Sequence, residues 1–293
     1  MFQHTLAGLL ASTVLVASLR AEEPQIVWQL TEGLSAPESV YLDPVTKSLF
    51  VSQIRGGGGK AKDGDGGISR ISPSGEMLEE HWITGLNAPK GLRSHGDLLW
   101  VSDIDQLVGI SISAGKIVHK IDVPGADFLN DVACGPDGAV YVSDMAASRI
   151  HRYLNGELSV LAEGQQLQHP NGLLVHEGHL IIGGWGKGLQ PDFSTEELGQ
   201  LLKLNLATKE LTAITPEPAG HLDGIEIDGQ GGYVVTDWRN GKVLRISGKG
   251  AVQTLLSLPQ GTADHALLLP QGLLLLPEML ENRITAYQLK LGK

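Results

Sequence analysis

The feature that most constrains this chain is an internal repeat, because one four-strand pattern recurs six times. Each unit has an apolar strand, a Gly/Asp turn, a second strand that ends in a polar or small residue, and in most units two further short strands. The second strands read LFVSQ, LLWVSD, AVYVSD, LIIGG, YVVTD and LLLLPE. Four short strands per unit, joined by Gly, Asn and Asp turns, are typical of a propeller blade. The repeat therefore predicts an all-β fold, a six-bladed β-propeller.

The two ends of the repeat array are incomplete in complementary ways. Residues 25–33 (QIVWQLTEG) precede the first unit, whereas the last unit ends one strand short with residues 284–290 (ITAYQLK). Pairing of these two segments would complete the sixth blade and remove an open sheet edge. We therefore expect the N- and C-terminal strands to close the ring.

Residues 1–21 are interpreted as a signal peptide that precedes the propeller. The apolar run Leu6–Ser18 is too short to span a bilayer as a helix, but it has the length of a signal-peptide core. Cleavage after Ala21 would leave residues 22–293 as one propeller domain. This predicts an exported protein, periplasmic or secreted; a disordered or tethering tail is the alternative.

The charge of the chain limits its partners. A formal net charge of −11 argues against nucleic acid and against an anionic membrane, since both attract a basic face. The one cysteine, Cys134, removes a disulfide framework and a Cys-rich metal site from consideration. We expect a monomer whose partner is a small-molecule substrate.

The residue that opens each inner strand, which we call the axial position, indicates where the functional face lies. Successive axial positions are separated by 52, 40, 41, 52 and 41 residues, so blades one and four carry insertions, at 54–67 and 185–200. Both insertions follow the second strand, at the end where the inner strand starts, and these two blades face each other across the axis. We expect the two loops to wall a substrate pocket; a linker role is the alternative. The axial positions are Glu38, Lys90, Asn130, Asn171, Asp223 and Asp264.

Five of the six axial positions carry side-chain oxygen. Carboxylates crowded around one axis repel each other and lose solvation unless a cation compensates them. Mixed carboxylate and amide donors favour one hard divalent metal ion, with Ca²⁺ preferred and Mg²⁺, Mn²⁺ or Zn²⁺ possible. The alternative is a set of polar caps on strand ends around a water-filled channel.

Four short motifs at these positions occur in a familiar order. They are Ala-Pro-Glu-Ser around Glu38, Asn130-Asp131 before Gly-Pro-Asp-Gly, Pro-Asn-Gly around Asn171, and Asp-Gly at Asp223. With them the chain resembles the regucalcin, gluconolactonase and luciferin-regenerating-enzyme family of six-bladed propellers, and more distantly the paraoxonase-type propellers. The resemblance implies one catalytic divalent metal held by Glu38, Asn171 and Asp223, with Asn130 in or beside the first shell. Members are typically lactonases or related ester and phosphoester hydrolases.

The chain departs from the gluconolactonase pattern at two places. Glu38 is followed by Ser-Val-Tyr rather than Gly-Pro-x-Trp, and Phe128 replaces the sugar-contacting Arg two residues before the matching Asn. These departures predict a more apolar substrate than an aldonolactone. Lys90 is also unusual beside a metal, so we expect it to lean toward Asp264 or toward a substrate carboxylate or oxyanion.

The leading functional hypothesis is a metal-dependent hydrolase of a lactone or ester. Asp223 is the predicted general base and Asp264 the reserve base, while Lys90 would stabilise the oxyanion that develops on the substrate. The alternative is a non-catalytic propeller that binds a ligand or protein partner and holds a structural Ca²⁺. Further candidates for substrate contact, water orientation or proton transfer are Asp131, Phe128, Trp185, His221 and His265.

Overall fold

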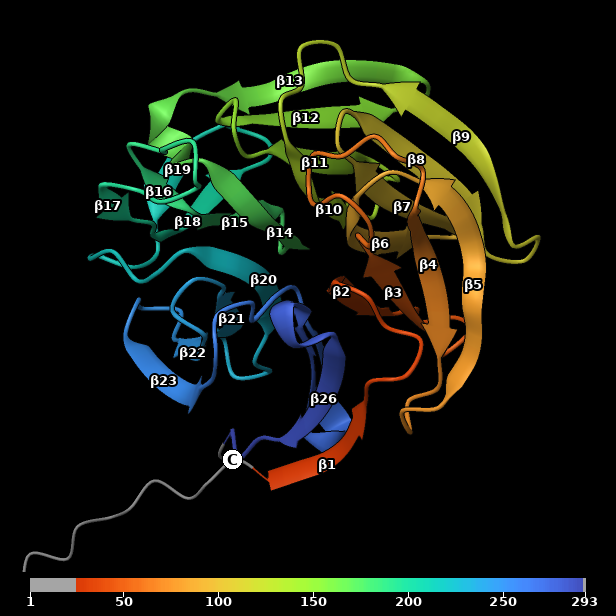
Figure 1. The fold of residues 1–293 in the computed structure, drawn as a ribbon. Helices are drawn as coiled ribbons and strands as arrows, with labels where there is room; N and C mark the ends of the chain where they lie inside the picture. The colour runs from red at the N-terminus through yellow and green to blue at the C-terminus, as the bar shows by residue number, and fades with distance from the viewer. Residues whose placement is uncertain (1–24, 292–293) are drawn as a thin grey trace, which may run out of the picture.

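A computed structural model describes residues 25–291, and that part of the chain is built from strands. It forms six four-stranded antiparallel sheets and one two-stranded hairpin, with the sheets arranged around a common axis (Figure 1). The predicted six-bladed β-propeller is confirmed. The signal-peptide prediction falls on residues outside the described range. Within that range no helix has the length and hydropathy needed to cross a membrane.

The first three blades are each formed by four consecutive strands, so that every sheet is built from one contiguous stretch of chain. The order from the axis outward follows the sequence in each blade. Their strands are β2 (Pro37–Leu42), β3 (Leu49–Gln53), β4 (Gly66–Ile71), β5 (Met77–Leu86), β6 (Pro89–His95), β7 (Leu98–Asp103), β8 (Gln106–Ser111), β9 (Lys116–Asp122), β10 (Leu129–Cys134), β11 (Val140–Asp144), β12 (Arg149–Leu154) and β13 (Glu157–Glu163).

Blade five follows the same scheme, whereas blades four and six depart from it. The β16–β17 hairpin is inserted in blade four, and the outer strand of blade six is β1 from the start of the chain. Three short 3₁₀ turns, η1 (Gln165–Leu167), η2 (Leu269–Gln271) and η3 (Met279–Glu281), lie between strands. The strands are β14 (Pro170–His176), β15 (His179–Gly184), β16 (Gly186–Lys187), β17 (Glu197–Leu198), β18 (Leu201–Asn205), β19 (Leu211–Ala213), β20 (Leu222–Ile227), β21 (Tyr233–Asp237), β22 (Lys242–Ile246), β23 (Val252–Ser257), β24 (Ala266–Leu268), β25 (Leu273–Glu278), β26 (Arg283–Gln288) and β1 (Gln25–Leu30).

Closure of the ring follows the prediction. Strand β1 pairs antiparallel with β26, and the Gln29 side chain donates a hydrogen bond to Thr285 Oγ1 at 3.1 Å. Trp28 and Leu30 pack against the apolar cluster between blades six and one. The first and last strands of the described chain therefore share one sheet.

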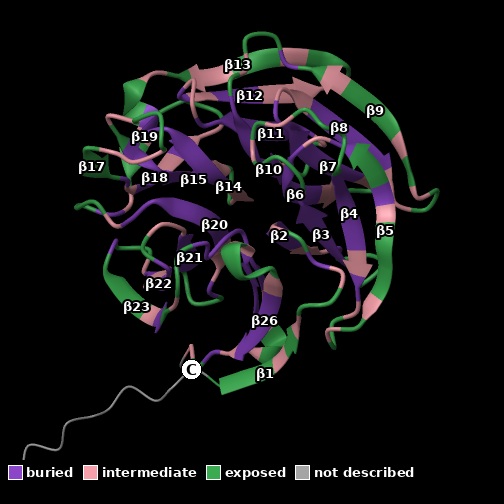
Figure 2. Ribbon diagram, in the orientation of Figure 1, coloured by how far each residue is buried: buried purple, intermediate pink, exposed green. Residues whose placement is uncertain are grey.

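The core is divided among the contacts between blades. One such cluster joins Phe50 and Ile68 of blade one to Leu92 and Val101 of blade two. Because each blade is covered on both faces, its second strand is buried on both sides, as β3 and β25 show. The outermost strands are largely exposed (Figure 2). This packing fixes the inner strands rigidly around the axis.

Candidate functional site

Irregular pairing turns the axial side chains toward the mouth of the ring. In blade five the register between β20 and β21 shifts between Leu222 and Ile225, and blades one to four show the same shift at the start of the inner strand. Such a bulge re-aims a side chain that regular pairing would place within the sheet. The axial residues within these bulges are Glu38, Lys90, Asn130, Asn171 and Asp223.

The aspartates that end several second strands hold the segment before the axial residue. Asp103 accepts the Ala88 N–H at 2.7 Å, and Asp144 accepts the Phe128 N–H at 2.9 Å. Asp237 accepts the corresponding N–H in blade five. A second strand that ends in Val-Ser-Asp or Val-Thr-Asp thus fixes the main chain two residues before the axial residue, and in this way it positions the axial side chain.

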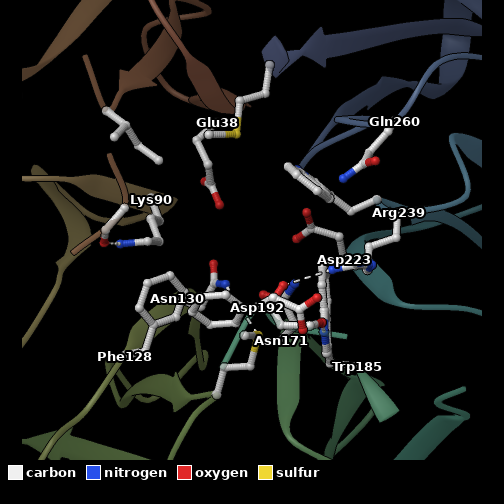
Figure 3. Close-up of a pocket in the computed structure, with 16 residues that line it drawn as sticks. Glu38, Lys90, Phe128, Asn130, Asn171, Trp185, Asp192, Asp223, Arg239 and Gln260 are labelled. Atoms are coloured by element: carbon white, nitrogen blue, oxygen red, sulfur yellow. Dashed lines mark hydrogen bonds between the residues drawn. The ribbon is translucent and has the colours of Figure 1, made fainter. Parts of the chain in front are cut away.

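The five axial residues of blades one to five line one cavity of about 220 Å³ (Figure 3). All five are buried. Two of them contribute carboxylates and two contribute amide groups, so four oxygen-bearing side chains and the Lys90 ammonium meet at the buried end of the cavity. The structure therefore brings together the predicted metal-binding residues Glu38, Asn130, Asn171 and Asp223.

The electrostatics of this cluster disfavour two ionised carboxylates. Burial raises the pKa of Glu38 well above its usual value, and the charges of Asp223 and Asp264 add to the effect. Burial also raises the pKa of Asp223, with contributions from Asp264 and Asp131, against a hydrogen bond from Asn171. A cation held between the two carboxylates would reverse both shifts.

Two buried oxygens in the cluster have no hydrogen-bond partner, namely Glu38 Oε2 and Asn171 Oδ1. A buried polar atom without a partner is costly, and a bound ion would satisfy both atoms. Nowhere in residues 25–291 do three His, Cys, Asp or Glu side chains gather as metal ligands; the set here mixes two carboxylates with two amides. That donor set fits a hard divalent ion such as Ca²⁺.

Lys90 lies beside the cluster and is held by main-chain carbonyls. Its Nζ donates to Ala88 O at 2.9 Å and to Gly59 O at 3.1 Å, and it lies 4.4 Å from the centre of the Phe128 ring. Burial lowers the pKa of Lys90 to about 8, against the opposing charge of Glu38. The structure shows no lean toward Asp264; the third N–H of the ammonium remains for a ligand in the cavity.

Asp264 does not occupy the axial position of blade six, so this prediction is wrong. In blade five the Trp238 N–H bonds to the carbonyl of His221, two residues before the axial residue; in blade six the Met279 N–H bonds to Gly261. The axial residue of blade six is therefore Ala263. Asp264 lies one residue further along, outside the cavity lining, and accepts the Ser39 hydroxyl at 2.5 Å.

Asp131 and Asp264 belong to a charged layer beneath the cavity. Asp131 accepts the main-chain N–H groups of Val132 and Leu173, each at 2.6 Å, and does not line the cavity. The Arg93 guanidinium lies 3.9 Å from Asp264 and 3.3 Å from Glu226. These carboxylates therefore position strands and balance charge at a level below the cavity.

The two predicted histidines also lie outside the cavity lining. His221 Nε2 lies 3.0 Å from Thr195 Oγ1, and its ring packs 5.1 Å from that of Trp185. His265 is fully buried, neither of its ring nitrogens has a hydrogen-bond partner, and burial lowers its pKa to about 3. His221 supports the cavity wall, and His265 is a neutral residue of the interior.

Both long loops reach the cavity, as the spacing of the axial positions predicted. Gly59 comes from the first loop, and Trp185 and Phe193 come from the second. Phe193 packs 5.0 Å from Phe128, and the Lys60 ammonium lies 5.5 Å from the Phe128 ring. The two loops thus meet over the wall formed by Phe128.

Sequence reasoning missed a collar of apolar side chains around the cavity. Each collar residue directly follows the last residue of a second strand, in five of the six blades, so one position of the repeat carries the signal. Trp185, the collar residue of blade four, was predicted only as part of its loop. Arg239 and Gln260 were also missed, and they lie in irregular loops that carry no period. The collar consists of Ile54, Met145, Trp185, Trp238 and Met279.

Comparisons with known proteins concern the fold alone. No family model matches the chain, and no curated protein matches it in sequence. Among solved structures it is similar to a streptogramin B lyase, with a TM-score of 0.63 and 15% identity over 91% of this chain and 97% of that one. It is also similar to a catalytically inactive variant of virginiamycin B lyase from Staphylococcus aureus, solved with quinupristin, with a TM-score of 0.61 and 15% identity over 91% and 99%. The likeness spans the whole propeller.

Proposed function

We propose that this protein is a divalent-metal-dependent hydrolase of a lactone or related ester, with Ca²⁺ as the preferred ion. The observation that carries the proposal is the pair of buried, unpartnered oxygens, Glu38 Oε2 and Asn171 Oδ1, which line the same cavity as Asp223. The motif resemblance to the regucalcin and gluconolactonase family supports it. The apolar collar favours a substrate less polar than an aldonolactone.

Glu38, Asn171 and Asp223 would hold the ion, with Asn130 beside them. When bound, such an ion polarises a carbonyl and lowers the pKa of water. Asp223 is the general base, because its carboxylate lines the cavity beside the residues that would hold the ion. Asp131 positions Asn171 indirectly, since it accepts the Leu173 N–H two residues further along β14.

Lys90 stabilises the oxyanion that develops on the substrate carbonyl. Two of its N–H groups are committed to main-chain carbonyls, which fixes the ammonium and directs the third N–H. One donor of this kind supplies about 3 kcal/mol of transition-state stabilisation. Asp264 has no part in the reaction as proposed, because it lies outside the cavity lining.

The test is a screen of aryl esters and lactones with Ca²⁺ and with chelator. Turnover that is lost in chelator and restored by Ca²⁺ is expected. Asp223→Asn abolishes turnover and much of the metal affinity, whereas Lys90→Met lowers turnover far more than metal affinity. Metal binding without turnover of any ester would instead favour a non-catalytic propeller with a structural ion.

Hydrolysis must also be separated from elimination, because the two solved structures are named as lyases. The reaction is run in ¹⁸O-labelled water with the best ester or lactone, and the product is weighed by mass spectrometry. Incorporation of one labelled oxygen is expected for hydrolysis. A product that gains no oxygen and carries a new double bond would contradict the proposal.

We also propose that residues 1–21 direct export and that the mature protein is a monomer. The N-terminal sequence of the exported protein and its mass in solution test these two points. Export without cleavage near Ala21, or a dimer at micromolar concentration, would overturn them.

A further inference from the structure

Three polar residues that line the cavity have no part in the proposed reaction, Asp192, Arg239 and Gln260. Arg239 lies in the loop between β21 and β22, and Gln260 lies in the loop between β23 and β24. Figure 3 shows both on one side of the cavity, opposite Phe128. They therefore form a polar side of the mouth, supplied by blade five and the segment that follows it.

Both side chains retain hydrogen-bonding capacity. Arg239 Nη1 donates to the main-chain oxygen of Asp192 at 3.1 Å, and no carboxylate of the described chain lies within 4.0 Å of the guanidinium. The Asp192 carboxylate also lines the cavity and accepts hydrogen bonds from Ser194 at 2.6 and 3.0 Å. These hydrogen bonds lower the pKa of Asp192, and the charge of Arg239 adds to the effect. The Gln260 amide makes no hydrogen bond within residues 25–291. A guanidinium with open N–H groups beside a free amide is suited to a carboxylate.

Most of the remaining cavity wall is apolar. Phe128 and Trp185 are buried and pack with Met145 and Phe193 in one apolar cluster. Lys90 adds a second cation at the buried end. A molecule that fills this cavity would thus meet oxygens and an ammonium at its reacting carbonyl, aromatic rings along its body and a guanidinium at its far end.

We propose that Arg239 and Gln260 form a carboxylate-binding subsite, and that the substrate is an aromatic or similarly apolar ester or lactone with a carboxylate remote from the scissile bond. This inference rests on the proposed function for its reacting end. A cavity of about 220 Å³ holds a single-ring molecule of this kind. The carboxylate is the recognition group, and the aromatic wall selects against sugars.

The kinetic test compares 4-acetoxybenzoate with its methyl ester, which share a scissile bond and differ in charge. Wild type should prefer the carboxylate, and Arg239→Gln should lower the ratio of the two kcat/KM values by about tenfold or more. Arg239→Lys should restore part of the preference. The matched control is Arg152→Gln, whose arginine lies 3.6 Å from Asp137 away from the cavity. An unchanged ratio in Arg239→Gln would overturn the inference.

A binding test separates this inference from the proposed function. The Ca²⁺-loaded protein is titrated calorimetrically with 3-phenylpropanoate and with its neutral amide. Tighter binding of the carboxylate that is lost in Arg239→Gln supports the subsite even when no ester is hydrolysed. Carboxylate binding that needs Ca²⁺ but is indifferent to Arg239→Gln would place the anion on the ion and contradict the subsite.

Discussion

Neighbouring inner strands can approach closely only because a glycine follows the axial residue in several blades. A Cβ at Gly172 would collide with the main-chain oxygen of Asp223, and a Cβ at Gly91 would collide with Asp131. The Asn-Gly and Asp-Gly pairs of the sequence therefore have a steric cause: the first residue supplies the oxygen and the second admits the neighbouring strand.

Replacement of Gly172 tests this close approach. Gly172→Ala should lower the free energy of unfolding by about 1–3 kcal/mol or more, because overpacking at the axis must move a neighbouring strand. Gly59→Ala is the control, since its nearest atom would be a Phe128 ring carbon at 3.5 Å, an ordinary contact. Thermal and denaturant unfolding measure both variants. Equal stability of the two variants would contradict the steric argument.

The half-buried carboxyl of Glu226 should make stability depend on pH. Burial raises its pKa from 4.5 to about 7, against the charge of Arg93 and with that of Asp264. The folded state thus favours the protonated form, so this contribution is present in full below about pH 4.5 and is lost as the pH rises through 7.

Glu226→Gln cannot ionise and should gain stability relative to wild type as the pH rises from 5 to 8. The measurement is the difference in Tm between the two proteins across that range. Glu210→Gln, at an exposed position, is the control and should show a constant difference. A Tm difference that stays constant for Glu226→Gln as well would contradict the raised pKa of Glu226.

Most axial oxygens could be predicted from the sequence because they recur at one repeat position. Asp264 could not be placed correctly, because a repeat aligned by residue type does not reveal a one-residue change of register. Ala263 carries no chemistry that would mark it as axial. In a strand, a shift of one residue moves a side chain to the other face or the next layer.

At the scale of elements, the two long loops differ in how firmly they are attached. The first loop is held by exposed ion pairs, Lys60 with Asp127 and Lys62 with Asp105, which contribute little to stability. The second loop includes the β16–β17 hairpin and contributes Trp185, which is buried. The insertions were predictable from the spacing of the repeats. The residues that attach the loops occupy no fixed position in the repeat, so the attachments were not predictable.

Shortening the first loop should therefore separate folding from function. Replacement of residues 56–63 by a short Gly-Ser turn should change Tm little and should raise KM or alter the preference among esters. It should also lower kcat, because it removes the Gly59 carbonyl that holds Lys90. Trp185→Ala is the contrasting variant and should cost about 3–5 kcal/mol of stability. An active, fully folded enzyme with unaltered KM for every ester would show that the first loop is only a linker.

At the scale of the whole molecule, a bound ion would join strands of four blades. Saturating Ca²⁺ should raise Tm, because a ligand that binds only the folded state at 100 times its Kd contributes about 2.7 kcal/mol. Chelator should remove the gain, and Asp223→Asn should show none in Ca²⁺. Scanning calorimetry of both proteins provides the measurement; identical Tm values for wild type in Ca²⁺ and chelator would contradict a metal site.

Strand β1 should be required for a stable ring, but it should not need to be the first strand of the chain. Deletion of residues 25–30 exposes the β26 edge and should lower Tm markedly. A circular permutant that joins residue 291 to residue 25 through a short linker, with new ends in the exposed turn at 207–209, should fold as wild type does. Loss of folding in the permutant would show that more than the β1–β26 pairing closes the ring.

The same pairing orders events during synthesis. Five blades can form from contiguous stretches of chain. The bond from Gln29 to Thr285 can form only after a further 256 residues have been synthesised. The contact with the greatest sequence separation is slow to form, since its loop-closure entropy is the largest. A chain interrupted before Arg283 leaves Trp28 and Leu30 without their strand partner, so the ring can close only after the sixth blade has been synthesised.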